Sequence, residues 1–322
     1  MRQLKQDYYL ELIKKIYRKL RSFKRRFTES KLTQNPFYEK KELQKKDSKV
    51  LLALLRHDCH RLEKAYYNNY IDDIKKADSY QYIKDRAVSV LNVIKEKKEI
   101  NDDPSLIWAN DILNSYPDFD TIYKQRKKKG LTLNKLEGDK FLEHLKLRRS
   151  CRIWSSRQPD KNTLKIFSEK LIEAAISAPN TGNRQAWRFC VLIDEVDRHL
   201  FKIIKEKHCY EAPLMIFVGM DSRFYEHAGD MDHAMYHDAG AALMQIVNTG
   251  HFYGFGTCWN YLAQGQVTSR PQNVEAYENF VKTFNIPDYI IPSGIVSIGL
   301  IDEIPPTPDR MPVADLLIKK PT

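Results

Sequence analysis

Apolar residues recur with helical spacing through the first 100 residues. One face of an opening helix carries, at steps of 4, 3, 4, 3 and 4, the residues Tyr9, Ile13, Ile16, Leu20, Phe23 and Phe27. Two or three further helices are predicted by Leu51, Leu54, Leu55, Leu62, Tyr66, Ile74, Val90, Leu91 and Ile94. The segments DDPSLIW at 102–108, YPDFD and KQRKKKG, which run up to Gly130, indicate loops, turns and a connector. We therefore expect a helical region over residues 1–140, with a boundary near 130–147.

The pattern changes after residue 147. Runs rich in β-forming residues, WRFCVLI and PLMIFVG, alternate with helical patterns and glycine turns. A helix over 164–177 precedes a strand over 187–193. A second helix over 238–253, with Asp238 near its N-cap and Gly254 after its end, precedes the strand FGTCWNYL. This alternation predicts layers of helices and strands.

Glycine and charge divide the 322-residue chain at the same place. The first of the 12 glycines is Gly130, and ten of them lie beyond residue 147. Residues 1–147 carry 34 basic and 22 acidic residues, whereas residues 148–322 carry 19 and 20, so the formal net charge of +11 belongs to the first part. No aromatic base-stacking motif accompanies this charge, so we expect no nucleic-acid binding.

The polar face of the opening helix is basic. Such a helix packs against its own protein, or it lies on an anionic membrane or an acidic partner, so a peripheral membrane contact through residues 1–30 stays open. No run approaches the roughly 18 apolar residues of a membrane span, and charges from Lys5 onward interrupt the N-terminus, unlike a secretory signal. We expect a cytoplasmic protein, with the inner membrane surface as the alternative location.

Neither the cysteines nor the histidines form a recognisable metal or disulfide motif. The five cysteines contain no CxxC pair, so we expect no disulfide framework. The segment HDCHRLEK groups His57, Cys59 and His60, and His233 and His237 have the spacing i, i+4. Both groups lack a further ligand cluster, so we expect no metal site.

Two polar segments after residue 147 are candidates for ligand binding. The segment RRSCR places Arg148, Arg149, Ser150 and Arg152 within five residues, and guanidinium groups with a hydroxyl match the oxygens of a phosphate. The turn APNTGNRQAWRF offers the amides of Asn180, Asn183 and Gln185 to the polar edge of a planar ring. The ordinary alternatives are a solvated row of arginines and an Asn/Gly turn.

Four motifs in register resemble the FMN-dependent nitroreductase family: RRSCR, APNTGNRQAW, DAGAAL followed by GHFYGFGTCW, and IVSIGL leading to PDRMP. The resemblance covers about residues 145–320 and leaves residues 1–140 unassigned. It implies an α+β fold, a three-layer sandwich around a mainly antiparallel central sheet, preceded here by an all-helical N-terminal region. It also implies a homodimer with FMN at the subunit interface and with NADH or NADPH as the electron donor.

The resemblance further implies roles for individual residues. The FMN phosphate, the ribityl chain and the N1/O2 edge of the flavin would be held by Arg148, Arg149, Ser150 and Arg152, with Arg152 as the catalytic charge beside N1. The loop that reaches the flavin of the partner subunit would comprise Pro179, Asn180, Thr181, Asn183 and Gln185. The remaining cofactor-binding residues would be Gly256, Asn260 and Tyr261 along one strand, the last two near N5, and Arg310 at the phosphate. The sequence departs from the family pattern at two positions: Ala186 replaces the usual proline, and Pro308 replaces a lysine common among relatives. Without that lysine, binding of the phosphate would depend more on Arg148 and Arg149.

The expected activity is the transfer of hydride from NAD(P)H through FMN to a small conjugated or nitro-type acceptor, by a ping-pong mechanism. One alternative is an enzyme of the same fold with different flavin chemistry: a dehalogenase, a flavin-fragmenting enzyme or an azoline dehydrogenase. The other alternative is a protein that binds a membrane or an acidic partner through its N-terminal helices.

Overall fold

The computed structural model describes residues 39–67, 74–100, 102–117, 119, 130–225 and 233–318. The predicted helix over residues 9–27 and the membrane contact through residues 1–30 lie outside these ranges. The chain folds as two units. The first combines residues up to Lys127 with 182–184 and 224–232, and the second holds the remainder. The domain limits expected from the sequence, 1–140 and 145–320, stay a prediction.

Helices make up the described elements of the first unit: α2 (Lys40–Gln44), α3 (Ser48–Tyr67), α4 (Ile74–Lys97) and α5 (Pro104–Ser115). Helix α3 packs against α4 and α5, and α2 packs against α4. The buried stripe of α3, at steps of 4, 4 and 3, consists of Leu51, Leu55, Cys59 and Leu62. The facing stripe of α4 consists of Ile83, Ala87, Val90 and Ile94. The helices predicted from the apolar spacing of residues 51–94 are therefore confirmed.

The prediction of a loop over residues 102–108 is wrong, because Pro104 begins α5. The side chain of Asp103 accepts a hydrogen bond from the N–H of Ser105 at 2.8 Å and caps the helix. Proline fits the first turn, where its missing N–H would have had no helical partner. The buried stripe that holds α5 against its neighbours consists of Leu106, Ala109, Ile112 and Leu113. The Asp-Pro pair is thus a helix start rather than a turn.

Four antiparallel strands form the sheet of the second unit, in the order β1-β2-β4-β3. They are β1 (Trp187–Leu192), β2 (Leu214–Asp221), β3 (Gly256–Tyr261) and β4 (Ile290–Gly299). The register skips Ser293, because Pro292 faces Gly219 whereas Gly294 faces Val218. This bulge lets Ile290 and Ile295, an odd number of positions apart, join one core cluster.

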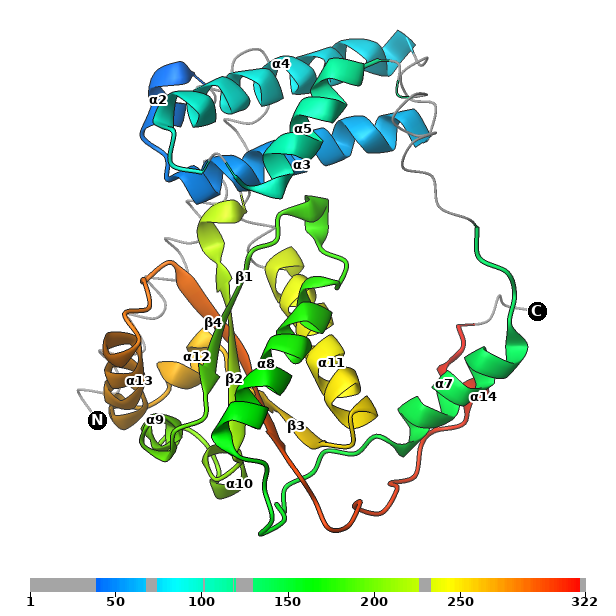
Figure 1. The fold of residues 1–322 in the computed structure, drawn as a ribbon, viewed down its shortest axis with the longest axis vertical. Helices are drawn as coiled ribbons and strands as arrows, with labels where there is room; N and C mark the ends of the chain where they lie inside the picture. The colour runs from blue at the N-terminus through cyan, green and yellow to red at the C-terminus, as the bar shows by residue number, and fades with distance from the viewer. Residues whose placement is uncertain are drawn as a thin grey trace. The chain divides into compact units, whose positions relative to one another are not determined.

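Helices cover both faces of this sheet (Figure 1). On one face lie α8 (Lys161–Ile176) and α11 (Met235–Phe252). On the other lie η3 (His199–Phe201), α10 (Lys207–Tyr210), α12 (Gln264–Val267) and α13 (Pro271–Thr283). Strand β2 is buried at every residue between them. The second unit is therefore the predicted α+β sandwich, with three layers around an antiparallel sheet.

The remaining elements of the second unit surround this sandwich. They are α7 (Lys135–Leu147), α9 (Glu195–Arg198) and α14 (Val313–Leu316). The short helices η2 (Thr181–Asn183) and η4 (Ser222–Phe224) each contain residues of both units. Helix α7 has no buried residue. In the described part of the chain, no helix is both long and apolar enough to span a membrane.

Candidate functional site

Residues 148–152, which we call the entry segment, run beside the start of β3. Ser150 forms a parallel bridge with Thr257, and the N–H of Cys151 donates to the carbonyl of Thr257 at 2.9 Å. Gly256 permits this approach, since a Cβ there would lie 2.4 Å from Cγ2 of Ile301 and 2.9 Å from Cβ of Cys151. Gly256 therefore has a packing role, and its role in cofactor binding stays a prediction.

Replacement of Gly256 by alanine is expected to lower the free energy of unfolding by about 1–3 kcal/mol, because overpacking forces the neighbouring chain to shift. The matched control is Gly138→Ala in α7, where no atom lies within 4 Å of the added Cβ. That control should be neutral or stabilising, since alanine favours a helix. Urea unfolding followed by circular dichroism measures both. Equal stability of the two variants would contradict the packing role.

The side chain of Arg149 is buried and forms its hydrogen bonds with other groups of the protein. Its side chain is 8% exposed and donates to the carbonyls of Lys146 and Arg148 and to the hydroxyl of Thr307. The hydrogen bond between Arg149 and Thr307 thereby places residues 307–318, which we call the C-terminal segment, beside the entry segment. Arg310 follows three residues later, within about 11 Å of extended chain. The structure thus joins Arg149 to the stretch that carries Arg310, but a phosphate would have to compete for the Arg149 guanidinium.

A cavity of about 320 Å³ adjoins the entry segment. Its lining comprises Arg148 and Ser150 of the entry segment, Met244 and Val247 of α11, and Trp259 and Tyr261 of β3. A guanidinium and a hydroxyl can bind an anionic group, and the aromatic and aliphatic side chains can pack against a flat ring. Sequence reasoning missed Met244, Val247 and Trp259. Periodicity could have pointed to them. Trp259 lies two residues from the predicted Tyr261 on the same strand, and Met244 and Val247 are three residues apart on one helix, so each pair shares a face.

The side chain of Asn260 points away from this cavity. Residues 259 and 261 face the cavity, so strand alternation turns Asn260 to the opposite face. There its Nδ2 donates to Oγ of Ser297 at 2.8 Å, and its Oδ1 lies 2.9 Å from Nε2 of His208. If residue 260 contacts a ligand in the cavity, as predicted, it therefore does so through its backbone atoms and not through its side chain. Its neighbour Tyr261 is 67% exposed.

The end of β3 is held by a half-buried lysine. Lys205 donates through Nζ to the carbonyl of Tyr261 and to Oε1 of Gln266. Burial lowers the pKa of Lys205 to about 8. This contact fixes the backbone where β3 leaves the cavity.

The loop over residues 179–185 is tied to the first turn of α11. The N–H and the hydroxyl of Thr181 donate to Oδ1 of Asp238 at 2.9 and 3.0 Å. The indole N–H of Trp187 donates to the backbone carbonyl of Asp238 at 3.0 Å. The helix begins three residues earlier than predicted, at Met235, so Asp238 lies in its first turn rather than at its start. Asp238 anchors the loop. Within the loop, Pro179, Thr181 and Gln185 are exposed, and Asn180 and Asn183 are partly buried.

The loop and the cavity lie on different sides of α11. At 3.6 residues per turn, Asp238 is rotated by about 120° from Met244 and by about 180° from Val247. The structure therefore does not bring the loop into the cavity of the same chain. One chain presents two separate groups of predicted site residues: the entry segment with β3, and the loop.

Positive charge at the entry segment is available to a ligand. Among the described residues, no carboxylate pairs with Arg148, Arg152 or Arg310. Arg152 is exposed, and its Nη1 lies 3.4 Å from the carbonyl of Ser150. Burial, with His144 and the arginines nearby, lowers the pKa of His251, so this ring stays neutral at pH 7. The local charge therefore comes from the guanidinium groups.

The cysteines near the cavity are not reactive thiols, and the described residues form no metal site. Burial raises the pKa of both Cys151 and Cys258, which keeps these thiols protonated. Across the described ranges, no three His, Cys, Asp or Glu side chains form a group that could hold a metal ion.

Comparison with known proteins identifies the second part of the chain. Residues 145–208 match the model of the nitroreductase family. Over 175 residues, the chain is 27% identical to a "Putative NADH dehydrogenase/NAD(P)H nitroreductase" of Methanothermobacter thermautotrophicus, and the match covers 52% of this chain and 81% of that protein. The C-terminal part of the chain carries a nitroreductase-family domain. This confirms the predicted family, and the match to the family model begins at residue 145, three residues before the entry segment.

Two further proteins are similar to part of this chain. Over 66 residues, the chain is 38% identical to an iodotyrosine dehalogenase 1 homolog of Caenorhabditis elegans, covering 20% of this chain and 19% of that protein. The chain is also similar to the solved structure of an FMN-dependent nitroreductase from Clostridium difficile R20291, with 25% sequence identity and a TM-score of 0.42. That match covers 52% of this chain and 91% of the nitroreductase chain.

Proposed function

We propose that the nitroreductase-family domain is an FMN-dependent oxidoreductase that passes hydride from NAD(P)H to a small conjugated or nitro-type acceptor. The observation that carries the proposal is the cavity in which Arg148 and Ser150 meet Trp259 and Tyr261. Its donors and its aromatic walls suit a ligand with both a phosphate and a flat ring. The family match and the name of the archaeal relative support the flavin and the nicotinamide donor.

Each group in the cavity has a separate task in this proposal. Arg148 and Ser150 bind the phosphate, while Trp259 and Met244 pack against the ring and exclude water from it. Arg149 supports the phosphate end by holding the backbone of residues 146–148 and the segment that bears Arg310. Arg152 supplies a positive charge that favours the electron-rich form of the ring. Bound FMN supplies the redox chemistry itself, accepting and returning hydride in a ping-pong cycle.

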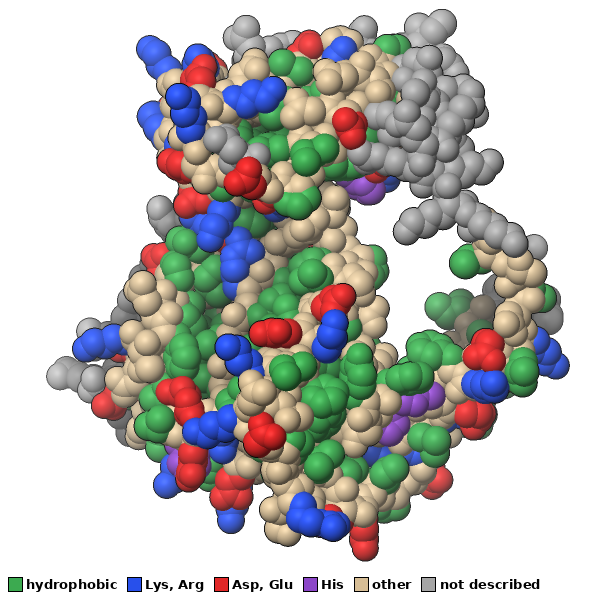
Figure 2. All heavy atoms as spheres, viewed as in Figure 1, with side chains coloured by type: hydrophobic (Ala, Val, Ile, Leu, Met, Phe, Trp, Pro, Cys, Tyr) green, Lys and Arg blue, Asp and Glu red, His purple; other side chains and the backbone are tan. Residues whose placement is uncertain are grey.

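We propose that the complete site is built by two copies of the chain. The loop and the cavity lie on different sides of α11, so the loop would serve the cavity of a second copy. Large exposed apolar side chains support this assembly: Leu136, Phe141, Leu142 and Leu147 on α7, and Met311, Val313, Leu316 and Leu317 in the C-terminal segment. Figure 2 shows hydrophobic side chains along α7 and over α8 and α11. Apolar patches of this kind mark interaction surfaces.

The purified protein is expected to be yellow and dimeric, and to lose its flavin absorbance near about 450 nm when NADH or NADPH is added without oxygen. Absorption spectroscopy and analytical ultracentrifugation measure these properties. A nitroaromatic or a quinone should then restore the absorbance. A colourless monomer that does not take up added FMN would contradict the proposal. Release of halide from a halogenated phenol, with no turnover of nitro compounds, would instead indicate the dehalogenase alternative.

A further inference from the structure

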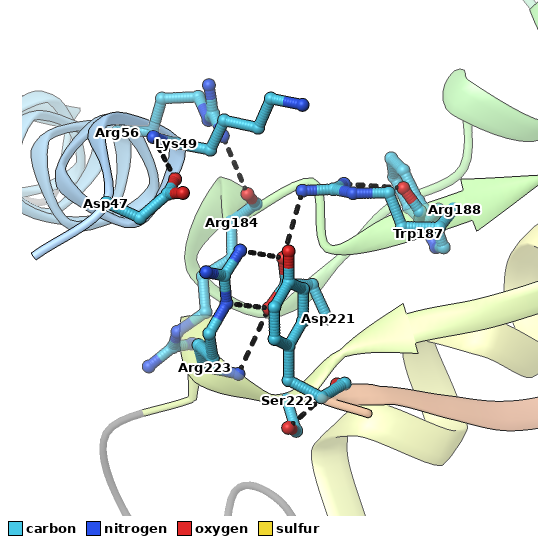
Figure 3. A network of polar contacts seen from close by, with 10 residues as sticks. Asp47, Lys49, Arg56, Arg184, Trp187, Arg188, Asp221, Ser222 and Arg223 are labelled. Carbon is cyan, nitrogen blue, oxygen red and sulfur yellow. Dashed lines mark hydrogen bonds and ion pairs between the residues drawn. The ribbon is translucent and has the colours of Figure 1, made fainter. Parts of the chain in front are cut away.

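The peptide bond between Arg184 and Gln185 is held from both sides. Arg56 of α3 donates through Nη2 to the carbonyl of Arg184 at 3.0 Å, as Figure 3 shows. The N–H of Gln185 donates to Oδ1 of Asn180 at 3.0 Å. Both polar atoms of this peptide therefore have fixed partners. The partner of the carbonyl comes from the N-terminal helices, because Arg56 lies on α3. Residues 182–184 belong to the same unit as α3.

The backbone around this peptide needs such support. Gly182, Asn183 and Gln185 have φ angles of 63°, 53° and 56°. Glycine adopts this left-handed region freely and asparagine tolerates it, but for glutamine it costs roughly 1–2 kcal/mol. Conformations of this kind persist where the surroundings hold them. The two hydrogen bonds to the 184–185 peptide act directly beside the strained residue.

Arg56 is itself fixed by the helical unit. Its side chain is buried, and Nη1 lies 3.3 Å from Oγ of Ser105 on α5. The next residue, His57, closes against the loop: a Cβ on Gly182 would lie 2.2 Å from its Cδ2. The guanidinium of Arg184 lies over the ring of Tyr225, 5.4 Å from its centroid. The tip of the loop is thus packed within the first unit and is not an independent turn.

We propose that Arg56 is a positioning residue for the loop over residues 179–185, so that the N-terminal helices set the conformation in which this loop binds the flavin. The inference rests on the proposed function, because Asn180, Thr181, Asn183 and Gln185 are its predicted flavin-contacting residues. It gives the helical region a task inside the cofactor site of the enzyme. Arg56 does not touch the reacting atoms and acts through the 184–185 peptide.

Arg56→Met tests the clamp by removing the guanidinium and keeping an aliphatic side chain. In the full-length chain, hydrogen–deuterium exchange at the amide of Gln185 should become about tenfold faster, and the Kd for FMN should rise about three- to tenfold, as expected for loss of a bond to a charged donor. Arg56→Lys should restore part of both. The matched control is Arg61→Met, which lies about 140° further round α3 and should change neither.

The two readouts separate the possible failures. If the wild-type chain binds no FMN, the proposed function fails. If exchange at Gln185 in Arg56→Met equals that of the wild type, the clamp is overturned whatever the protein binds. Faster exchange with an unchanged Kd for FMN would overturn the link between the clamp and the cofactor.

A second pair of variants leaves Arg56 intact, in case Arg56→Met unfolds the helices. Gly182→Ala introduces the clash with His57 and should weaken FMN binding. His57→Ala removes the clashing ring, so the double variant should recover part of the lost affinity. The difference between the double and single variants measures coupling between helix and loop. Strictly additive effects on the Kd would overturn the inference.

Discussion

Alanine in place of Arg148 is expected to weaken FMN binding by about 10- to 100-fold, the effect of removing a charged donor from an anionic group. Arg148 lines the cavity with Ser150, and no carboxylate of the described chain neutralises it. The neighbouring His251 cannot replace the charge at pH 7, because burial lowers its pKa. Titration of the apo-protein with FMN, followed by the quenching of flavin fluorescence, measures the change.

Arg157→Ala is the matched control for this prediction. The side chain of Arg157 is 90% exposed, and its Nη2 lies 3.7 Å from Asp302, so its removal should leave the affinity for FMN unchanged. Arg149→Ala provides a contrast, since it removes bonds to the backbone and should lower stability as well as affinity. Equal affinities of Arg148→Ala and Arg157→Ala would place the phosphate elsewhere.

Alanine in place of Asp58 is expected to lower the free energy of unfolding of the helical unit by about 3–5 kcal/mol, because it leaves a buried arginine without its counter-ion. Asp58 is fully buried on α3, and Nε of Arg86 on α4 donates to its Oδ2 at 2.7 Å. Arg86 is itself 9% exposed in its side chain. Urea unfolding followed by circular dichroism measures the loss. Loss of this ion pair should also loosen Arg56, two residues earlier on α3.

Two controls accompany the Asp58 prediction. Asp85→Ala removes an exposed carboxylate of α4 that bonds Gln81, and it should have little effect. Replacing both partners, in Asp58→Leu with Arg86→Met, should recover most of the stability, because no charge is then left buried and unpaired. A double variant as unstable as Asp58→Ala would contradict this explanation.

The same ion pair has a defined pH dependence. Burial opposes ionisation of Asp58, but the neighbouring His57 and the hydrogen bonds from Arg86 outweigh it, so its pKa lies below the ordinary value. Its contribution to stability is therefore complete above about pH 4, the ordinary pKa of an aspartate, and disappears as the pH falls through the lowered value. Asp58→Ala should lack this part of the acid dependence.

Local patterns account for most of the fold that could be predicted. The β-forming residues of WRFCVLI and the spacing of leucines in α3 correctly predicted strand β1 and helix α3. Helix α5 was missed because Asp103 and Pro104 serve equally in a turn and at a helix start. What separates the two is the buried stripe that follows, whose partners on α3 and α4 lie far away in the sequence.

The sequence by itself determined the family of the C-terminal part, the layered α+β architecture and the two polar segments of the candidate site. These features follow from short-range order, because spacing along a strand or helix decides which residues share a face. The tertiary structure alone decided that Arg149 binds the backbone, that Asn260 faces away from the cavity, and that Arg56 bonds the carbonyl of Arg184, 128 positions away. Side-chain directions and long-range partners depend on how the elements pack, and no local pattern encodes them.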